Sequence, residues 1–289
     1  MWWLKPGIDF TGGSLLRLEF PVQRLTTDQV QDALKDTAKY GQAVVQPVGD
    51  KELLIKLKAL DEPTHQEVLG KINQKLAEVE GVKDMKPENS VKENGFSSIG
   101  PQIGKELQKK AQIAIVLVLV AIIAYMAWAF RQVASSISKY ESVIYGVFAI
   151  VALIHDVLIT VGVFSFLGHF YNVEVDSFFI AALLTILGYS INDTIIVFDR
   201  IRENIIHEGT EDFRSLVNKS INETIVRSFN TSMATLLVLF CILLFGGSTT
   251  FYFILALLIG ITAGTYSSIF LASPLLVWWK ERKSKTAVI

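Results

Sequence analysis

Two acidic residues stand inside long apolar runs of this 289-residue sequence, each directly after another polar residue. Asp156 follows His155, and Asp193 follows Asn192. A charge at the centre of a bilayer costs about 2.5–3.5 kcal/mol on insertion scales, so an acid kept there usually handles protons or ions. Asn192 and Ser190 are expected to hydrogen-bond either the Asp193 carboxylate or a water molecule that bridges to it. The structural alternative is a neutral aspartic acid that only joins neighbouring helices, with His155 as a packed side chain.

The position of each acid within its run predicts its depth in the membrane. At a rise of 1.5 Å per residue, Asp156 is expected roughly 21 Å from Ser142, and Asp193 roughly 9 Å from Asp199. The two acids are therefore predicted at different depths, as separate stations on a path rather than as one cluster.

The composition indicates an integral membrane protein. Hydrophobic residues make up 51% of the sequence and charged residues 19%, against about 25% charged residues in soluble proteins. About 20 apolar residues cross a bilayer, and the sequence has five such runs, at 111–130, 142–167, 178–198, 229–245 and 251–279. The net charge of −1 argues against nucleic-acid binding, and the single Cys241 excludes an internal disulfide.

Lys and Arg are distributed unevenly among the connections between these runs. They occur in 131–141, in 199–230 and in the tail 280–289, whereas 168–176 and 246–250 contain none. Because cytoplasmic loops are enriched in Lys and Arg, the first group of connections and the C-terminus are predicted to be cytoplasmic. By alternation, the segment before the first run is predicted to be extracytoplasmic.

That segment, residues 1–110, is predicted to fold as a domain outside the membrane. We expect strands over 14–20, 42–48, 53–57 and 82–85, the last resuming near 96, and helices over 26–40 and 61–80. The order β-α-β-β-α-β is typical of a split βαβ, ferredoxin-like α+β domain. Gly12-Gly13 is interpreted as a turn that needs positive φ rather than as a phosphate-binding loop.

The start of the sequence does not explain how such a domain is exported. An exported domain needs a signal or a preceding membrane helix, and residues 1–4 are too short to be either. We therefore expect that a leading helix is missing from the sequence, or that residues 1–4 are its stub.

Other motifs point to structure rather than to catalysis. The sequence has no G-x-x-x-x-G-K-[ST] loop and no H-E-x-x-H helix, so no enzyme activity, metal site or cofactor is expected. Gly188 and the pair Gly260-x-x-x-Gly264 are interpreted as helix-packing positions. Residues 213–225 predict an amphipathic helix on the membrane surface or against the bundle. Arg227 at its end either snorkels to the interface or pairs with an acid.

Four segments of the sequence together resemble the SecF family, the protein-export membrane subunits that pair with SecD and are related to resistance–nodulation–division transporters. These segments are GIDFTGG (7–13), SIGPQIG (98–104), LIHD (153–156) and LTILGYSINDTIIVFDRIRE (184–203). The resemblance implies half of a resistance–nodulation–division-type bundle. The family has six spans with the external domain between the first and second, and five of those spans are present here.

The resemblance also implies a function. SecF acts with SecD beside the SecYEG channel in the bacterial cytoplasmic membrane and uses the proton-motive force to help export polypeptide, with SecA as the separate ATP motor. The chain is thus expected to be a non-enzymatic subunit in contact with membrane lipid, with protons as its coupling ion. By motif, Asp193 corresponds to the family's intramembrane acid and Arg227 to the basic residue facing it. Asp156, His155 and Asn192 are expected along the same proton pathway.

Two other classes of function stay open. A proton-coupled transporter of small molecules or lipids would suit the related superfamily, although such chains normally hold both halves of the bundle. A passive scaffold would use Asp193 only to hold helices together. Vesicles under a pH gradient distinguish the three classes, through release of exported protein, efflux of a small molecule, or neither.

Overall fold

The computed structural model describes six stretches of the chain, 3–21, 24–80, 90–129, 139–209, 212–247 and 250–286. They belong to two compact units. The first comprises residues 6–110, and the second comprises residues 3–5 together with the chain from 111 onward.

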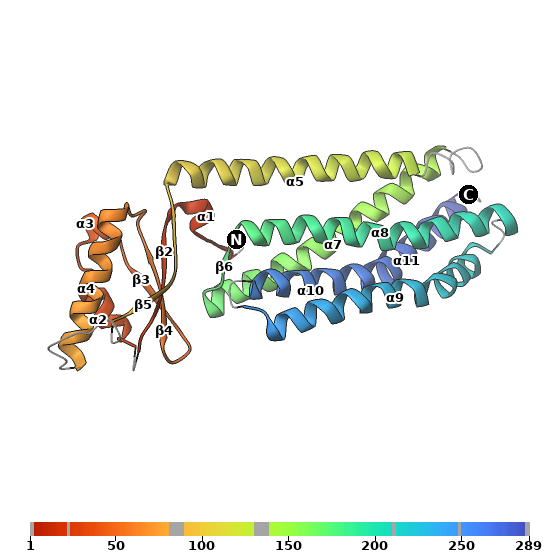
Figure 1. The fold of residues 1–289 in the computed structure, drawn as a ribbon. Coiled ribbons are helices and arrows are strands. Elements are labelled where there is room, and N and C mark those ends of the chain that lie inside the picture. The colour runs from red at the N-terminus through yellow and green to blue at the C-terminus, as the bar shows by residue number, and fades with distance from the viewer. Residues whose placement is uncertain are drawn as a thin grey trace. The chain divides into compact units, whose positions relative to one another are not determined.

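Residues 6–110 form a four-stranded antiparallel sheet with helices along one face (Figure 1). The strands are β2 (Gly13–Glu19), β3 (Val44–Val48), β4 (Glu52–Leu57) and β5 (Lys92–Ile99), and the helices are α2 (Thr27–Ala33), α3 (Thr37–Tyr40) and α4 (Glu62–Glu80). The strand order is β3-β4-β2-β5. Because β4 lies between β2 and β3, which are joined through helices, the predicted split βαβ arrangement is confirmed.

Alternation along the strands builds the core of this domain. In β2, Leu16 and Leu18 are buried while the residues between and beside them are partly exposed, since successive side chains point to opposite faces of a sheet. From α4, Val68, Ile72 and Leu76 join the same cluster at helical spacing. The apolar residues that alternate along β2 and those at helical spacing along α4 therefore form one apolar layer between the sheet and the helix.

The single helix predicted over 26–40 is wrong, because the chain forms α2 and α3 instead. Thr26 opens α2 with a capping box, and the helix ends at Leu34. The carboxylate of Asp36 then accepts a hydrogen bond from the backbone N–H of Lys39 at 3.2 Å. An aspartate that binds a backbone N–H three residues later starts a helix and competes with continuing one. The strand predicted over 82–85 lies outside the described residues, and the chain near 96 is part of β5.

The glycine pair joins the short helix α1 (Ile8–Thr11) to β2. Gly12 has a φ of +73° and Gly13 a φ of +138°, so the interpretation as a turn with positive φ is confirmed. A Cβ on Gly12 would lie 2.7 Å from the Cα of Pro101. Residues 7–13 and 98–104, two of the segments that carry the family resemblance, are therefore in contact.

Among the described residues, five helices are long and apolar enough to cross a membrane, and apart from the start of the first they belong to the second unit. They are α5 (Pro101–Ala129), α7 (Lys139–Tyr171), α8 (Ser177–Glu208), α9 (Phe213–Phe245) and a last span made of α10 (Phe251–Ser267), the π-helical turn η3 (Ser268–Ala272) and α11 (Ser273–Thr286). All five predicted runs lie in these helices. Before them, the short strand β1 (Lys5–Pro6) pairs with β6 (Glu174–Val175).

The amphipathic helix predicted over 213–225 is not a separate element, because α9 continues without a break into the fourth span. Its Leu216 and Val217 are buried in one cluster with Ile201 and Ile205 of α8. Of the two locations expected for this segment, the structure therefore shows the one against the bundle.

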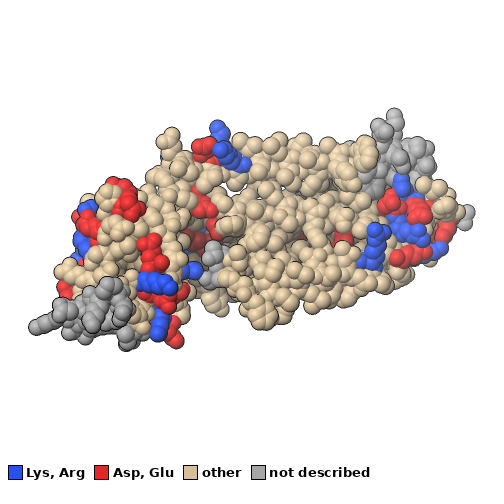
Figure 2. Space-filling view, viewed as in Figure 1, with Lys and Arg blue, Asp and Glu red and all other residues tan. Residues whose placement is uncertain are grey.

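Charged side chains gather where α8 ends and α9 begins (Figure 2). Arg200 forms ion pairs of 2.7 Å with Glu203 and with Glu223, and Lys219 pairs with Glu208. The middle of the bundle surface in this view consists mainly of uncharged residues. This distribution is typical of helices whose central part lies in hydrocarbon and whose ends reach water.

Candidate functional site

Asp193 lies on α8 in the core of the bundle, with 1% of its surface exposed. Its Oδ2 accepts long hydrogen bonds from Ser232 of α9 at 3.3 Å and from Thr265 of α10 at 3.4 Å. Thr265 also donates to Ser232 at 2.7 Å. In the described part of the chain, Oδ1 has no hydrogen-bond partner, and neither has the buried Oγ of Ser228, one turn before Ser232 on α9. The Asp193 carboxyl is thus buried, but its hydrogen bonds are long and involve only one of its two oxygens.

Asp156 lies on α7 and is fully buried. Its Oδ2 accepts hydrogen bonds from Ser190 of α8 at 2.5 Å and from Ser267 of α10 at 2.9 Å. Nδ1 of the half-buried His155 lies 3.0 Å from Oδ1. Both carboxyl oxygens therefore have a partner, and the acid joins three helices.

The two acids occupy the same layer of the bundle, so the prediction of separate depths is wrong. Ser190, which binds Asp156, precedes Asp193 by three residues on α8, a rise of about 4.5 Å. The partners on α10, Thr265 and Ser267, are two residues apart. The count took residues 142 and 199 as ends at the same level, but α8 continues nine residues beyond 199 to Glu208, whereas α7 begins at Lys139. Ser190 also bonds Asp156 rather than Asp193, contrary to expectation.

Two glycines allow α10 to approach α8 closely enough for these contacts. A Cβ on Gly260 would lie 2.2 Å from Cδ1 of Ile186, and one on Gly264 would lie 2.8 Å from Cβ of Ser190. Small residues are what permit such close packing of membrane helices. Gly188 takes no part in it: it is exposed, and a Cβ there would meet nothing within 4 Å in the described residues.

The π-helical turn η3 lies directly beside the acids. Ser267, which binds Asp156, comes just before this turn, and Ser268 opens it, with its Oγ 2.8 Å from Oγ1 of Thr194. A π-turn holds an extra residue, so it shifts the register of the face that follows. Such turns are frequent at functional sites. This one presents consecutive serines, both buried, to α7 and α8.

Two residues expected at the site point elsewhere. Asn192 is exposed, and so is Arg227, which forms no ion pair within the described residues. The reason is helical geometry, since neighbours in a helix point about 100° apart. Asp193 and Ser228 face the core, and the residues before them point about 100° away, to the exposed side of each helix.

Most of the hydroxyl residues around Asp156 and Asp193 were not predicted from the sequence. The unrecognised residues are Ser228, Ser232, Thr265, Ser267, Ser268 and Thr194. The available signal was their spacing: Ser228 and Ser232 are four residues apart, and Thr265, Ser267 and Ser268 fall within about one turn of an otherwise apolar run. Hydroxyls at helical spacing mark a polar stripe that must face the interior of a membrane bundle.

The chemistry that this arrangement supports is binding of a small ion. No group of three or more His, Cys, Asp or Glu that could hold a metal occurs among the described residues. A carboxyl with one unbonded oxygen, hydroxyls around it and no neighbouring cation can hold a proton at that oxygen. The fold and site thus define a polytopic helical membrane protein with a ferredoxin-like domain and two acids buried in its helical bundle.

Comparison of this chain with known protein families identifies its family. Residues 79–282 match the family model "Protein export membrane protein SecD/SecF, C-terminal", and residues 3–20 match the "SecD/SecF GG Motif", which includes Gly12-Gly13. The chain belongs to the SecD/SecF family.

Its relatives in that family are SecF proteins. "Protein translocase subunit SecF" of Thermobaculum terrenum is 39% identical over 96% of this chain and 86% of its own length. The protein of the same name from Synechocystis sp. is 37% identical over 97% of this chain and 84% of its own length. The crystal structure of SecDF, a translocon-associated membrane protein from Thermus thermophilus, superposes with a TM-score of 0.75 at 36% identity. That comparison covers 96% of this chain but only 34% of the SecDF chain.

Proposed function

We propose that this chain is the SecF-type subunit of a Sec protein translocase, and that it couples proton movement through its bundle to polypeptide export. Family membership supports the translocase role. The observation that carries the coupling is the state of Asp193, a buried carboxyl that has, within the described residues, one unbonded oxygen and no cation in ion-pair contact. An ionised carboxylate without such partners is too costly in a membrane interior. The arrangement therefore suits a carboxyl that holds a proton.

Proton release needs a second arrangement in which a positive charge comes closer. Arg227 is adjacent to the inward-facing Ser228, and its long side chain reaches the core after a partial rotation of α9. Its approach favours loss of the proton from Asp193, and its withdrawal favours uptake. If the two arrangements open to opposite sides of the membrane, each proton accompanies one cycle of helix movement. The chain itself catalyses no reaction in this scheme.

The proposed partners follow from the family. A SecD subunit would supply the other half of the bundle, as SecD and SecF segments share one chain in the structurally similar SecDF. The complex would act beside the SecYEG channel, where SecA hydrolyses ATP separately. By the Lys and Arg pattern, the ferredoxin-like domain lies outside the cytoplasmic membrane, where it meets emerging polypeptide.

Export into membrane vesicles that contain this chain, a SecD partner and the translocase tests the proposal. Asp193→Asn keeps the size of the side chain but cannot titrate, so the stimulation of export by an imposed proton gradient should disappear. Asp199→Asn is the matched control, because Asp199 lies on the same helix but is exposed and paired with Arg202. Its gradient response should be normal.

Co-purification with SecD should be unchanged in both variants. A full gradient response in Asp193→Asn would refute the coupling and favour the passive scaffold. Gradient-driven efflux of a small molecule without any effect on export would favour the transporter.

A further inference from the structure

Tyr189 of α8 binds the part of α9 that follows Arg227. Its hydroxyl donates to the backbone carbonyl of Thr231 at 3.2 Å and to Oγ1 of Thr235 at 3.2 Å. A phenol carries one hydrogen, so the two acceptors share it. Tyr189 lies about one turn before Asp193 on α8, and Thr231 lies about one turn after Arg227 on α9. The contact therefore joins the two helices whose relative rotation decides whether Arg227 approaches Asp193.

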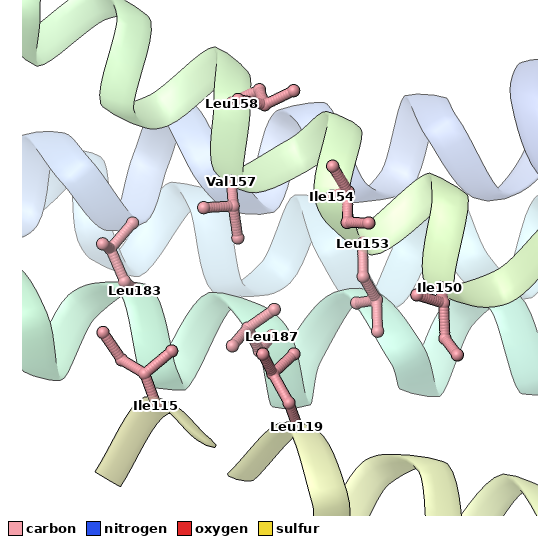
Figure 3. Close-up of a pocket in the computed structure, with 9 residues that line it drawn as sticks. All are labelled: Ile115, Leu119, Ile150, Leu153, Ile154, Val157, Leu158, Leu183 and Leu187. Atoms are coloured by element: carbon pink, nitrogen blue, oxygen red, sulfur yellow. The ribbon is translucent and has the colours of Figure 1, made fainter. Parts of the chain in front are cut away.

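The side of α8 that faces α5 and α7 is chemically different. Leu187, two residues before Tyr189, points about 160° away from it. Together with Leu183 it lines a crevice in which every lining side chain is aliphatic (Figure 3). This lining offers no hydrogen-bond acceptor, and a hydroxyl without a partner is unfavourable in a membrane. The Tyr189 hydroxyl therefore favours its partners on α9.

The segment 227–235 of α9, called here the threonine segment, is locally deformable. Oγ1 of Thr231 donates to the carbonyl of Arg227 at 2.8 Å, and Oγ1 of Thr235 donates to the carbonyl of Thr231 at 3.2 Å. Hydroxyls that bind a carbonyl four residues earlier slightly destabilise a helix and often bend it. Two such bonds in successive turns make a local rotation of the threonine segment easier than it would be in a helix without them.

The first part of α9 is attached to α8 more firmly. Glu223 forms an ion pair of 2.7 Å with Arg200 and accepts a hydrogen bond from Asn204 at 2.9 Å. Asn204 also donates to Ser220 at 2.9 Å, and both of these side chains are buried. The first part of α9 can therefore stay in place while the threonine segment turns. Such a turn would break the two long hydrogen bonds of Tyr189.

We propose that Tyr189 is a positioning residue for proton coupling, which holds the threonine segment in the rotation that keeps Arg227 away from Asp193. This inference rests on the function proposed above. When the phenol releases Thr231 and Thr235, the segment turns and Arg227 approaches the carboxyl, which favours loss of the proton. When the hydrogen bonds form again, Arg227 withdraws and the carboxyl takes up the next proton. Tyr189 itself exchanges no proton in this scheme.

The groups that face Asp193 determine what a change in its proton binding would report. Its partners from α9 and α10 are the hydroxyls of Ser232 and Thr265, which do not titrate near neutral pH. Asp156 and His155 of α7 lie in the same layer and contact each other. Within the described residues no cation is in ion-pair contact with Asp193. A change in the pH dependence of coupling therefore reports a positive charge that α9 brings closer or moves away.

The test measures gradient-driven export against the pH on the proton-donating side, in vesicles that contain the full chain, a SecD partner and the translocase. Tyr189→Phe removes only the hydroxyl. An average interhelical hydrogen bond in a membrane shifts an equilibrium about threefold, so Arg227 should lie close to Asp193 about threefold more often. The pH of half-maximal stimulation should then fall by about half a unit, because more acid is needed to protonate the carboxyl.

Two controls separate this effect from a general loss of structure. Tyr266→Phe on α10 removes the hydroxyl of a tyrosine that is 56% exposed and makes no hydrogen bond within the described residues, so its pH profile should match the wild type. Thr235→Val removes one acceptor of Tyr189 and should lower the half-maximal pH by a smaller amount, whereas Thr235→Ser keeps the hydroxyl and should keep the wild-type profile. A purely structural role would lower the amount of complex without moving the half-maximal pH.

The outcomes distinguish this inference from the proposed function. If Asp193→Asn abolishes the gradient response while the profile of Tyr189→Phe coincides with that of the wild type, the role of Tyr189 is overturned and the coupling at Asp193 stands. A shift of Tyr189→Phe toward higher pH would also overturn it, because the hydroxyl would then hold Arg227 near the acid. If Asp193→Asn keeps a full response, both proposals fail. Should Tyr189→Phe not assemble with SecD, the comparison of Thr235→Val with Thr235→Ser decides in its place, and identical profiles would overturn the inference.

Discussion

Asp156 and Asp193 are the same residue type in the same layer of one bundle, yet their surroundings differ. Asp156 has three partners at 2.5–3.0 Å, distributed over both carboxyl oxygens. Asp193 has two partners at 3.3 Å and 3.4 Å, both on Oδ2. Burial alone therefore does not identify the acid that handles protons.

The difference indicates a division of roles. A carboxyl whose two oxygens both have close partners is held firmly between the helices that supply those partners. A carboxyl with long bonds and an unbonded oxygen can gain or lose a proton with little rearrangement. We therefore interpret Asp156 as an anchor that joins α7, α8 and α10, and Asp193 as the group that titrates.

The largest effect expected from this division concerns stability. Asp156→Asn replaces one of two oxygens that both have close partners by a nitrogen that cannot accept a hydrogen bond, and a buried polar group left unsatisfied costs about 1–3 kcal/mol. We expect the free energy of unfolding to fall by about 2 kcal/mol, whereas Asp193→Asn should lower it by less than about 1 kcal/mol. Equilibrium unfolding of the purified chain in mixed micelles measures both. Equal losses, or a greater loss for Asp193→Asn, would show that Asp156 is not the more important of the two acids for stability.

A smaller effect separates the hydroxyl partners of the two acids. Interhelical hydrogen bonds in membranes average about 0.6 kcal/mol and reach about 1.7 kcal/mol. Ser190→Ala removes the 2.5 Å bond to Asp156 and should lie near the upper value. Ser232→Ala removes only a 3.3 Å bond to Asp193 and should lie at or below the average. The same unfolding measurement applies, and a reversed order would show that bond length does not rank these contacts.

Much of the fold was predictable because its signals are local. An apolar run long enough to span a bilayer is a property of one segment, and so is the alternation in β2. The acids at 156 and 193 could be singled out for the same reason. The break between α2 and α3 depended on one side chain, Asp36, binding a backbone N–H, which a helical pattern in the sequence does not reveal.

The partners of the acids could not be predicted, because they depend on how helices are rotated against one another. Whether Arg227 or Ser228 faces Asp193 is a matter of about 100° of rotation, and spacing within α9 does not fix that angle. The π-turn at Ser268 shifts which side chains of the last span face the bundle. No residue type in that apolar run predicts such a turn. Gly188 was wrongly predicted as a packing position for the same reason. The presence of a small residue does not reveal which side of its helix contacts a neighbour.

Glu67, a carboxyl outside the membrane, extends the comparison and gives the smallest expected effect. It binds Lys39 directly, accepts a hydrogen bond from the Tyr40 hydroxyl at 2.6 Å and lies 3.7 Å from Lys71. Lys39 first, then Tyr40, lowers the pKa of Glu67 from 4.5 to about 2. Since this pKa is depressed in the folded state, the stabilising contribution is fully present above pH 4.5 and is lost as the pH falls toward 2.

The effect is small because Lys39, Glu67 and Lys71 are all exposed to water, which screens their ion pairs. Hydrogen exchange of the full chain, compared with Glu67→Gln at matched pH, measures it in peptides from α4 and α3. At pH 6 the α4 amides of the variant should exchange somewhat faster than those of the wild type, and the difference should shrink below pH 4.5 and be lost as the pH falls toward 2. A difference that stays constant over this range would mean that Glu67 contributes packing rather than charge. Glu67 would then resemble Asp156, whose proposed role is to join elements, more than a group whose contribution depends on its ionisation.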